Sequence, residues 1–419
     1  MNSLDVYLSP CRSPGILSAK IWVRDGSRAD PINKKGLHSL LGSLLIRGCG
    51  PYNNLQLADL VEGLGAVLLS ETYEDGIMIS LKCTEEGSND LLPLLKWIIL
   101  EPRLEKEQID LERQLSIQAI NRQKENQFIL ALNKWKEIAY QNHPYSQEVI
   151  GSIKDLKTIT RTDLTSLSET ISSRQKVIVI SGSLPANIDT YLKDIKVMNY
   201  NPNKKKGQSI SDKFKKPNHF DTDKSIVITP QNTKQVVIIL GSTTIPHSHP
   251  DDIALRILSC HLGSGMSSVL FNILREEKGL TYDVGIYYPV RELNAPFIIH
   301  ASSSKDKAME TLILIKKCWN NLQYSLLSNE ELDLAKSKFR YNFAHNSQTI
   351  SQRAERKAHL IGLNIDENYD LQILNSIDSI TKEDIIRVSS LYLKWPVLSL
   401  CGPEDKLNQL RDFWIESSN

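Results

Sequence analysis

Residues 38–42 contain one part of a pattern that can bind zinc. The pattern is H-x-x-E-H: a helix places residues three and four apart on one face, so that two imidazoles hold the metal and the glutamate lies beside its bound water. This chain keeps His38, but Leu41 stands in place of the glutamate and Gly42 in place of the second histidine. Catalytic zinc normally takes three protein ligands and a water, so His38 alone cannot hold it.

His38 also has a purely structural explanation. On a helix it shares a face with Leu41, Leu44 and Leu45, and a histidine on such a face is usually packed or hydrogen-bonded. We therefore expect the side chain to belong to the core, and we expect this chain to bind no metal or other cofactor.

Arg275 and Tyr282 could stabilise a developing negative charge. Residues 267–275 predict a helix, 276–280 a turn and 281–288 a strand, and the returning strand can bring the phenol beside the guanidinium. Arginine is a permanently charged planar donor and tyrosine a neutral one, and both suit an oxyanion in a partly dry cleft. An arginine and a tyrosine seven residues apart are common, so the spacing alone is weak evidence.

Four segments resemble the pitrilysin/insulinase family of zinc peptidases, in particular its short branch of processing-peptidase-like chains. GLHSLLGSLLIRG resembles the helix with the zinc motif, and LERQLSIQAI resembles the later helix that carries the third ligand. The 76 residues between Gly42 and Ala119 match the family's spacing between its second and third ligands. HPYSQEVIGSIKDLKTIT resembles the segment after those helices, and LGSGMSSVLFNILREEKGLTYDV resembles the signature of the family's second half.

The resemblance implies a role for several of these residues. Ala119 falls at the third ligand position and offers only a methyl group. Arg275 and Tyr282 match the pair that reaches across to hydrogen-bond the carbonyl of the scissile peptide in catalytic assemblies of the family. Gly263 and Gly265 match the flexible glycine-bearing loop of its non-catalytic subunits, where glycine permits close approach of the backbone.

The resemblance also implies a partner. A homologous subunit with the complete motif would bind zinc and activate water, and the two would form a heterodimer. Unfolded peptides or presequences would be held in extended form along an edge strand, for which residues 69–73 are the candidate. The two halves of this chain would form half of a clamshell chamber, with the cleft for peptides between them.

Composition agrees with a two-domain protein that uses neither nucleic acid nor a membrane. The chain has 419 residues, 41% of them hydrophobic, and a formal net charge of +1, whereas a nucleic-acid-binding surface is basic. Six scattered cysteines without a C-x-x-C pair predict buried free thiols in a reducing compartment. The sequence shows no signal peptide and no apolar run long enough to span a bilayer. We therefore expect a cytoplasmic location.

An internal duplication predicts two versions of one α+β unit. Residues 153–164 parallel residues 374–385, which lie 221 positions later, and a short apolar run ending in a glycine follows each copy, at Gly182 and Gly402. LEKEQIDLERQ likewise resembles LSNEELDLAKS, 223 positions later. We predict an N-terminal domain over 1–200, a solvated linker rich in Lys, Pro, Asn, Asp and Ser over 201–224, and a C-terminal domain over 225–419.

Periodicity predicts the elements of each unit. Apolar residues alternate in the expected strands and recur every three to four residues in the expected helices. A hairpin at residues 74–76 favours antiparallel pairing, so each domain is expected to be a largely antiparallel or mixed sheet with helices packed on one face. The predicted strands are 18–24, 66–70, 76–82, 235–241, 282–288 and 297–302, and the predicted helices are 36–47, 56–64, 90–100, 105–122, 305–322 and 328–345.

Other constellations do not complete a site. His247 and His249 form an H-x-H before a helix, but no cluster of Cys, Asp or Glu completes a metal site, and Asp251 and Asp252 are expected to cap that helix. The glycines around Ser264 fit neither a phosphate loop nor a dinucleotide fingerprint.

Three hypotheses remain. The first is the non-catalytic subunit of a heterodimeric zinc peptidase. The second is a catalytically dead structural or peptide-binding protein of the same fold, like the core subunits of respiratory complexes; the Arg275 and Tyr282 pair weighs against it, since a scaffold needs no oxyanion donor. The third is an autonomous hydrolase, for which the sequence offers neither a nucleophile nor a ligand set. We expect the chain to be inactive by itself.

Overall fold

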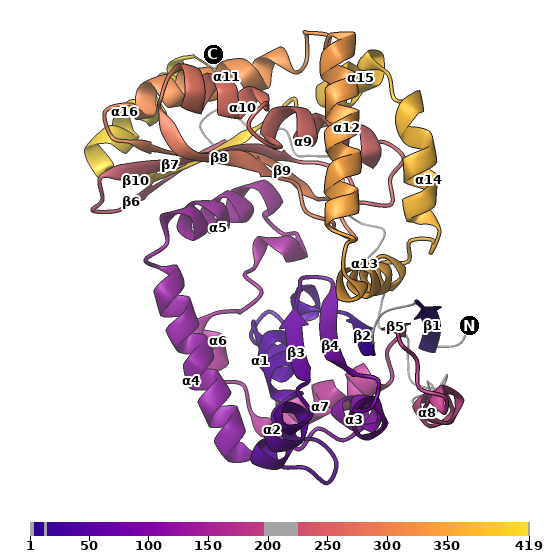
Figure 1. Cartoon of the computed structure of the whole chain (residues 1–419). Coiled ribbons are helices and arrows are strands. Elements are labelled where there is room, and N and C mark those ends of the chain that lie inside the picture. The colour runs from indigo at the N-terminus through magenta and orange to yellow at the C-terminus, as the bar shows by residue number, and fades with distance from the viewer. Residues whose placement is uncertain (1–3, 12–14, 197–224, 418–419) are drawn as a thin grey trace. The chain divides into compact units, whose positions relative to one another are not determined.

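The computed structural model describes residues 4–11, 15–196 and 225–417 (Figure 1). The chain forms two compact units. Unit 1 comprises Met1–Asn121, Gln147–Ser209 and His345–Glu367, and unit 2 comprises Arg122–Ser146, Ile210–Ala344 and Asn368–Asn419. Within the described residues, no helix is both long and apolar enough to cross a membrane.

Unit 1 is built on a mixed sheet with the strand order β1-β5-β2-β4-β3. β1 and β5 pair in parallel, and the other neighbours pair antiparallel. Most residues of β2, β4 and β5 are buried, as expected for strands covered on both faces. The strands are β1 (Leu4–Pro10), β2 (Ile16–Arg24), β3 (Val67–Thr72), β4 (Gly76–Thr84) and β5 (Lys176–Gly182).

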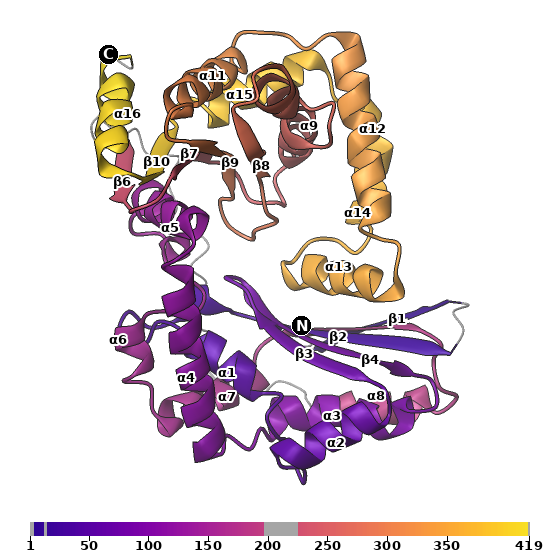
Figure 2. The same cartoon turned by 60° about the vertical axis from the view of Figure 1, so that its left-hand side comes forward.

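Most helices of unit 1 cover one face of this sheet (Figure 2). Their leucines and isoleucines form one core with alternate residues of the strands. The other face receives α13 (Ile350–Gly362), which packs against β2 and β5 and comes from the second half of the sequence. The other helices of unit 1 are α1 (Leu37–Leu44), α2 (Asn54–Gly63), α3 (Ser88–Leu100), α4 (Lys106–Gln123), α6 (Ile153–Leu156), α7 (Arg161–Ser172) and α8 (Ile188–Lys196), with the short 3-10 turn η1 (Ser27–Ala29).

Unit 2 repeats this architecture. Its sheet has the order β6-β10-β7-β9-β8, again with one parallel pair, β6 and β10. α5 (Gln127–Tyr140), from the first half of the sequence, packs against β10, β7 and β6 (Figure 2). The Trp135 indole nitrogen donates to the carbonyl of Val397 at 3.0 Å.

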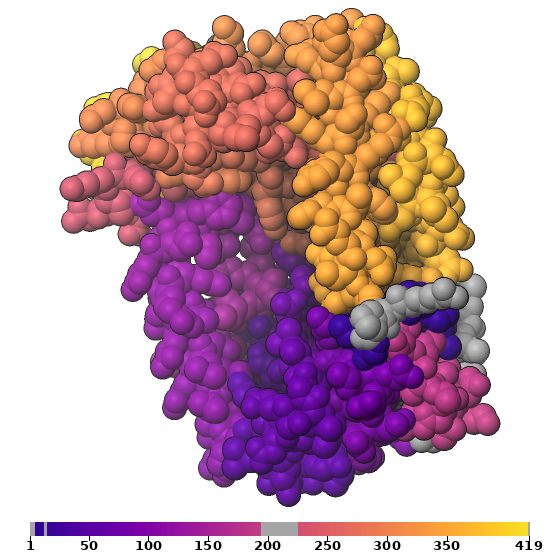
Figure 3. All heavy atoms as spheres, in the orientation of Figure 1, coloured from indigo at the N-terminus to yellow at the C-terminus, as the bar shows by residue number. Residues whose placement is uncertain are grey.

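The remaining elements of unit 2 follow the chain order. The strands are β6 (Ile226–Pro230), β7 (Gln235–Thr243), β8 (Thr281–Tyr287), β9 (Pro296–Ser304) and β10 (Val397–Gly402). The helices are α9 (Asp252–Gly263), α10 (Val269–Phe271), the π-helix η4 (Asn272–Glu277), α11 (Ala308–Asn321), α12 (Asn329–His345), α14 (Tyr369–Ser376), α15 (Lys382–Tyr392) and α16 (Glu404–Glu416), with the short turns η2 (Pro144–Ser146) and η5 (Ile377–Ser379). α12 lies on the surface of its unit (Figure 3).

The predicted fold class and duplication are confirmed. Each unit is an α+β structure around a mixed five-stranded sheet, and the two strand orders are the same. The duplication extends to single hydrogen bonds: Thr160 and Asp163 form a capping box at the start of α7, and Thr381 and Asp384 form the same box at the start of α15. The repeated strands β5 and β10 follow these helices and end at the predicted glycines.

The packing adds an exchange of segments to the predicted tandem domains. The segment with α5 belongs to unit 2, and the segment with α13 belongs to unit 1. The reason is that each sheet needs apolar cover on its second face, and that cover comes from the other half of the sequence. The linker predicted at 201–224 lies outside the described residues. All six cysteines are free, and four of them are buried.

One predicted helix has an unexpected form. The segment expected to be helical over residues 267–275 is a short α10 followed by the π-helix η4. After this helix, the amide of Leu280 donates to the carbonyl of Leu274, six residues earlier, at 2.7 Å. A π-turn widens the helix by one residue per turn and is often found at functional sites.

Candidate functional site

His38 is held inside unit 1 at the start of α1. Its ring nitrogen Nδ1 lies 2.6 Å from Oδ1 of Asp30, and only 3% of the residue is exposed. The Asp30 carboxylate also accepts bonds from the main-chain amides of Gly36 and His38, at 2.7 and 2.9 Å. The prediction that His38 is a hydrogen-bonded residue of the core is therefore confirmed.

The neighbouring positions of the broken motif carry no metal-binding side chains. Leu41 is fully buried in the core of unit 1. A Cβ atom on Gly42 would lie 2.3 Å from the side-chain oxygen of Thr72 on β3, so even alanine would clash. Ala119 is half-buried on α4. The described residues contain no group of three or more His, Cys, Asp or Glu that could hold a metal. This donor set does not fit zinc.

One buried carboxylate near the motif was not found from the sequence. Glu112 on α4 is 6% exposed and accepts a bond of 2.7 Å from Nε of Arg47, just after α1. It lies seven residues before Ala119, so the two share one face of α4. The ion pair joins the segment after α1 to α4, and its acidic member was visible in the sequence as a charge on that face.

Arg275 and Tyr282 lie together in unit 2. Arg275 is an exposed residue of η4, and Nη1 of its guanidinium donates to the main-chain carbonyl of Tyr282 at 3.2 Å. Its guanidinium carbon also lies 4.9 Å from the centre of the Phe271 ring. The sequence predicted the guanidinium beside the phenol; the contact is to the carbonyl of the same residue, and the side chain of Tyr282 is 89% exposed.

A β-bulge sets the direction of Tyr282. In the pairing of β8 with β9, Thr281 lies opposite Ser303 and Asp283 opposite Ser302, so Tyr282 is the extra residue of β8. The Thr281 hydroxyl lies 2.5 Å from the carbonyl of Ser302 and 2.7 Å from that of Asp283. A bulge bends a strand and redirects a side chain, and these bonds stabilise it. The result is a phenol projecting from an edge strand.

The two glycines of the predicted loop have different structural reasons. A Cβ atom on Gly263 would lie 2.8 Å from Cγ1 of Ile286 and 3.0 Å from its amide nitrogen, so glycine is needed where α9 approaches β8. Gly265 has a φ of +74°, which favours glycine, and its position is open. Between them the Ser264 hydroxyl accepts a bond of 2.9 Å from the amide of Asn342 on α12.

The predicted caps at the start of α9 are wrong. Asp251 occupies the N-cap position, but its carboxylate accepts no capping bond; it accepts two bonds from Arg387 and one from the hydroxyl of Tyr392, at 2.8 to 3.0 Å. A guanidinium competes successfully for this carboxylate because it donates through two parallel N–H groups.

Asp252 is the centre of a buried network. It is 1% exposed and lies 2.7 Å from His247 Nδ1, 2.6 Å from Arg256 Nε and 2.7 Å from the Tyr288 hydroxyl. Burial opposes ionisation of the carboxyl, but the charge of Arg256, together with His247 and Tyr288, outweighs burial and lowers its pKa to about 2. Burial and the nearby Asp252 charge raise the pKa of Tyr288 well above its usual value. The phenol therefore donates, and the carboxylate accepts.

β3 is an edge strand of its sheet and contains residues 69–72 of the segment 69–73 that the resemblance implied as an edge strand. Val67 and Leu69 are 50% and 51% exposed, so this edge carries apolar side chains that face water.

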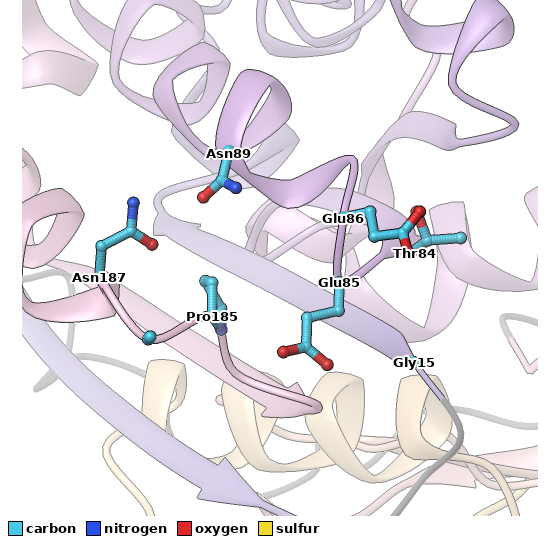
Figure 4. Close-up of a pocket in the computed structure, with 8 residues that line it drawn as sticks. Gly15, Thr84, Glu85, Glu86, Asn89, Pro185 and Asn187 are labelled. Carbon is cyan, nitrogen blue, oxygen red and sulfur yellow. The ribbon is translucent and has the colours of Figure 1, made fainter.

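Each unit also has a surface pocket. In unit 2 a pocket of about 580 Å³ lies between the start of α5 and the sheet, and Asp283, the residue after the bulge, lines it together with Phe128 and Ser302. In unit 1 a pocket of about 820 Å³ is lined by residues at the end of β4 and after β5, among them Glu85, Asn89 and Asn187 (Figure 4). None of the predicted site residues lines the second pocket.

Comparison with protein-family models gives two matches. Residues 15–152 match the model described as insulinase (peptidase family M16), and residues 159–339 match the one described as the peptidase M16 inactive domain. The two ranges follow each other and together cover most of the chain. The first match ends at residue 152 and the second begins at residue 159, so the second spans the end of the predicted N-terminal domain and the start of the C-terminal one.

Curated relatives are distant but extend over most of this chain. A Helicobacter pylori protein named non-peptidase homolog YmxG is 23% identical over 370 residues, 86% of this chain and 83% of that protein. A Rickettsia felis protein named uncharacterized zinc protease is 23% identical over 91% of this chain and 90% of its own. A Bacillus subtilis protein named uncharacterized zinc protease YmxG is 20% identical over 92% and 93%.

Solved structures share the fold. A peptidase M16 inactive domain from Pseudomonas fluorescens superposes with a TM-score of 0.83 at 20% identity, covering 95% of each chain. A Helicobacter pylori protease also gives 0.83, at 19% identity and with 96% and 97% covered. A chain of complex III2 from Candida albicans gives 0.76 at 15% identity, with 98% and 97% covered.

Proposed function

Because this chain belongs to the insulinase family of peptidases, M16, and the residues that the structure describes form no complete zinc site, we propose that it is the non-catalytic subunit of a heterodimeric zinc peptidase. A homologous subunit with the full H-x-x-E-H motif binds zinc and activates the water. This chain completes the chamber for an unfolded peptide and contributes Arg275 and Tyr282 to the reaction.

The observation that carries the proposal is the exposed pair Arg275 and Tyr282. A structural protein gains little from an 89% exposed tyrosine held out by a bulge beside an exposed arginine. Hydrogen-bond donors on this edge suit the carbonyl oxygen of a peptide bond under attack by water, because negative charge develops on that oxygen. The phenol donates one bond, and the N–H groups of Arg275 not used by the Tyr282 carbonyl donate others.

Each side chain has a separate task in this mechanism. The positive charge of the arginine attracts the developing oxyanion, while its bond to the Tyr282 carbonyl orients the guanidinium. The tyrosine donates without adding charge. The water and the metal come from the partner, so this chain supplies no nucleophile.

Extended peptides fit the exposed edge of β3. An edge strand offers unpaired main-chain N–H and C=O groups, and a peptide can add to it as a further strand. The exposed side chains of Val67 and Leu69 supply apolar contacts on that edge.

The test is reconstitution. The purified chain is mixed with a homologous chain of the same organism that carries the complete motif, and cleavage of a quenched fluorescent peptide is measured. We expect activity only in the mixture, abolished by a zinc chelator. The double variant Arg275→Ala/Tyr282→Phe should form the same complex by gel filtration but cleave about a hundredfold more slowly. A matched control, Arg411→Ala/Tyr324→Phe, changes a half-exposed arginine that pairs with the neighbouring Asp412 and an exposed tyrosine, both elsewhere in unit 2, and should be neutral. Full activity of the double variant would contradict the role of the pair.

A second function has one observation in its favour. The fold also occurs in complex III2 of Candida albicans, so this chain could be a structural or peptide-binding protein without a part in cleavage. Under this alternative the chain binds extended peptides, but no sister chain gains activity from it.

A further inference from the structure

β8 carries Tyr282 near one end and is followed by Tyr288 at the other. As the edge strand of its sheet, β8 pairs only with β9, and the bulge removes Tyr282 from that pairing. An edge strand with a bulge has fewer ladder bonds to hold its position than a central strand. Contacts outside the sheet must therefore define where the strand lies.

The first of these contacts is the bond from the Tyr288 hydroxyl to Oδ1 of Asp252, at 2.7 Å. Asp252 is buried and Tyr288 is half-buried, and the Arg256 guanidinium covers the Tyr288 ring, with its carbon 4.8 Å from the ring centre. Tyr288 lies six residues beyond Tyr282, which is about 20 Å along an extended strand. The two ends of the strand are thus held by different groups.

The second contact is made by the same helix. Asp252 begins α9, and Gly263 ends it against Ile286 of β8, with no space for a Cβ atom. α9 packs along β8 (Figure 2) and continues directly into the glycine loop. Asp252 itself is fixed by His247 and Arg256, so the helix begins at a rigid point.

We propose that Tyr288, through its bond to Asp252, is a positioning residue that fixes β8 and so places Tyr282 and the glycine loop for the bound peptide. This inference rests on the function proposed above. Tyr288 makes no contact with substrate in this role; it acts through the strand. α9 begins at Asp252 and ends at the glycine loop. The positions of Tyr282 and of the glycine loop therefore both depend on the bond between Tyr288 and Asp252.

The test uses Tyr288→Phe, which removes one hydroxyl and keeps the ring. Tyr287→Phe is the matched control: it removes a hydroxyl from the adjacent residue, which points to the opposite face of the sheet. Deuterium uptake is measured on the full chain by mass spectrometry for the peptide spanning 281–288 and, as an internal reference, for a peptide covering β4. Activity of each variant is measured in the reconstituted mixture.

We expect uptake in residues 281–288 to be about tenfold faster in Tyr288→Phe, with β4 unchanged and Tyr287→Phe within twofold of the wild type. The kcat of the mixture should fall about tenfold while KM stays within twofold, because the peptide still binds but Tyr282 is misplaced at the moment of reaction. If Tyr288 had only a structural role, its substitution would lower the midpoint of unfolding without lowering kcat relative to KM.

Unchanged uptake in residues 281–288, or equal increases in both variants, would overturn the inference. If Tyr288→Phe does not fold, Arg256→Lys, which keeps the charge but loses the planar contact with the ring, is judged by the same criteria. The two proposals fail separately. If the Arg275→Ala/Tyr282→Phe variant keeps full activity, the peptidase role is wrong, even where uptake shows that Tyr288 anchors β8.

Discussion

The Arg275 guanidinium donates to the main-chain carbonyl of Tyr282 at 3.2 Å and leaves the phenol of the same residue in water. One end of Tyr282 thus orients the arginine, and the other end is available to a ligand. The bulge in β8 makes this division possible, because it takes Tyr282 out of the pairing with β9.

The phenol of Tyr282 can be tested by itself. Tyr282→Phe should lower the kcat of the reconstituted enzyme by about ten- to a hundredfold, since one donor to the oxyanion is lost. The midpoint of thermal unfolding should not change, because the side chain is 89% exposed. Tyr324→Phe, at an 81% exposed tyrosine, is the control. An equal effect of both variants on kcat would show that Tyr282 has no special role.

Rebuilding the zinc motif should fail. The variant Leu41→Glu/Gly42→His/Ala119→Glu places a carboxylate in the apolar core. It also adds a side chain at Gly42, where even a Cβ atom would lie 2.3 Å from the Thr72 hydroxyl oxygen. We expect a much lower unfolding midpoint and no stoichiometric zinc by elemental analysis after dialysis. Ala119→Glu alone, on a half-buried site, should keep the fold. One zinc ion per chain in the triple variant would contradict this prediction.

The contact between Gly42 and Thr72 gives a second test of the same site. Gly42→Ala should destabilise the wild type by about 1–3 kcal/mol, because the added methyl meets the threonine oxygen. In a Thr72→Ala background the clash is removed, and the higher helix propensity of alanine should make the same change neutral or stabilising. Urea unfolding of the wild type, the two single variants and the double variant measures the coupling free energy between the two positions. Simple additivity of the two single effects would contradict the predicted clash.

The exchanged helix α5 should be essential to unit 2. Trp135 is fully buried, and its indole donates to Val397 on β10. Trp135→Ala should cost about 3–5 kcal/mol of unfolding free energy. Trp395→Ala, at a tryptophan that is 43% exposed, should cost much less. Denaturant unfolding followed by circular dichroism distinguishes the two variants, and a similar small loss in both would contradict the packing.

Lys176 predicts a pH dependence. Its ammonium group is buried in β5 and donates to the carbonyls of Ser172 and Arg174, and burial lowers its pKa from 10.5 to about 8. Between these values the unfolded chain holds the extra proton, so the free energy of unfolding rises with pH in this window, by up to about 3 kcal/mol. Lys176→Met should lack this rise when both proteins are unfolded in urea across the window. Parallel curves would exclude the lysine as its source.

Much of the fold followed from the sequence because it depends on local patterns. The helices α1 to α4 and the strands of the first hairpin repeat apolar residues with the period of their element, and their bounds differ from the predicted ones by a few residues at most. The duplication was visible because the capping residues Thr160 and Thr381 recur with the same neighbours.

The rest depends on distant partners, which no local pattern reveals. The exchange of α5 and α13 is decided by which uncovered sheet face each helix fits. The bulge at Tyr282 depends on the register with β9, and the role of Asp252 depends on Tyr288, 36 residues later. For Arg275 and Tyr282, the sequence predicted that the two residues lie together but misplaced the contact: it put the guanidinium beside the phenol, whereas the structure joins it to the carbonyl.

The reciprocal exchange of α5 and α13 has a consequence for biosynthesis. Unit 1 includes residues up to Glu367, so the ribosome must synthesise most of the chain before the first sheet receives its second cover. Until then the uncovered strands expose apolar surface to the cell. We therefore expect a nascent chain of this design to be prone to aggregation until its last fifth emerges.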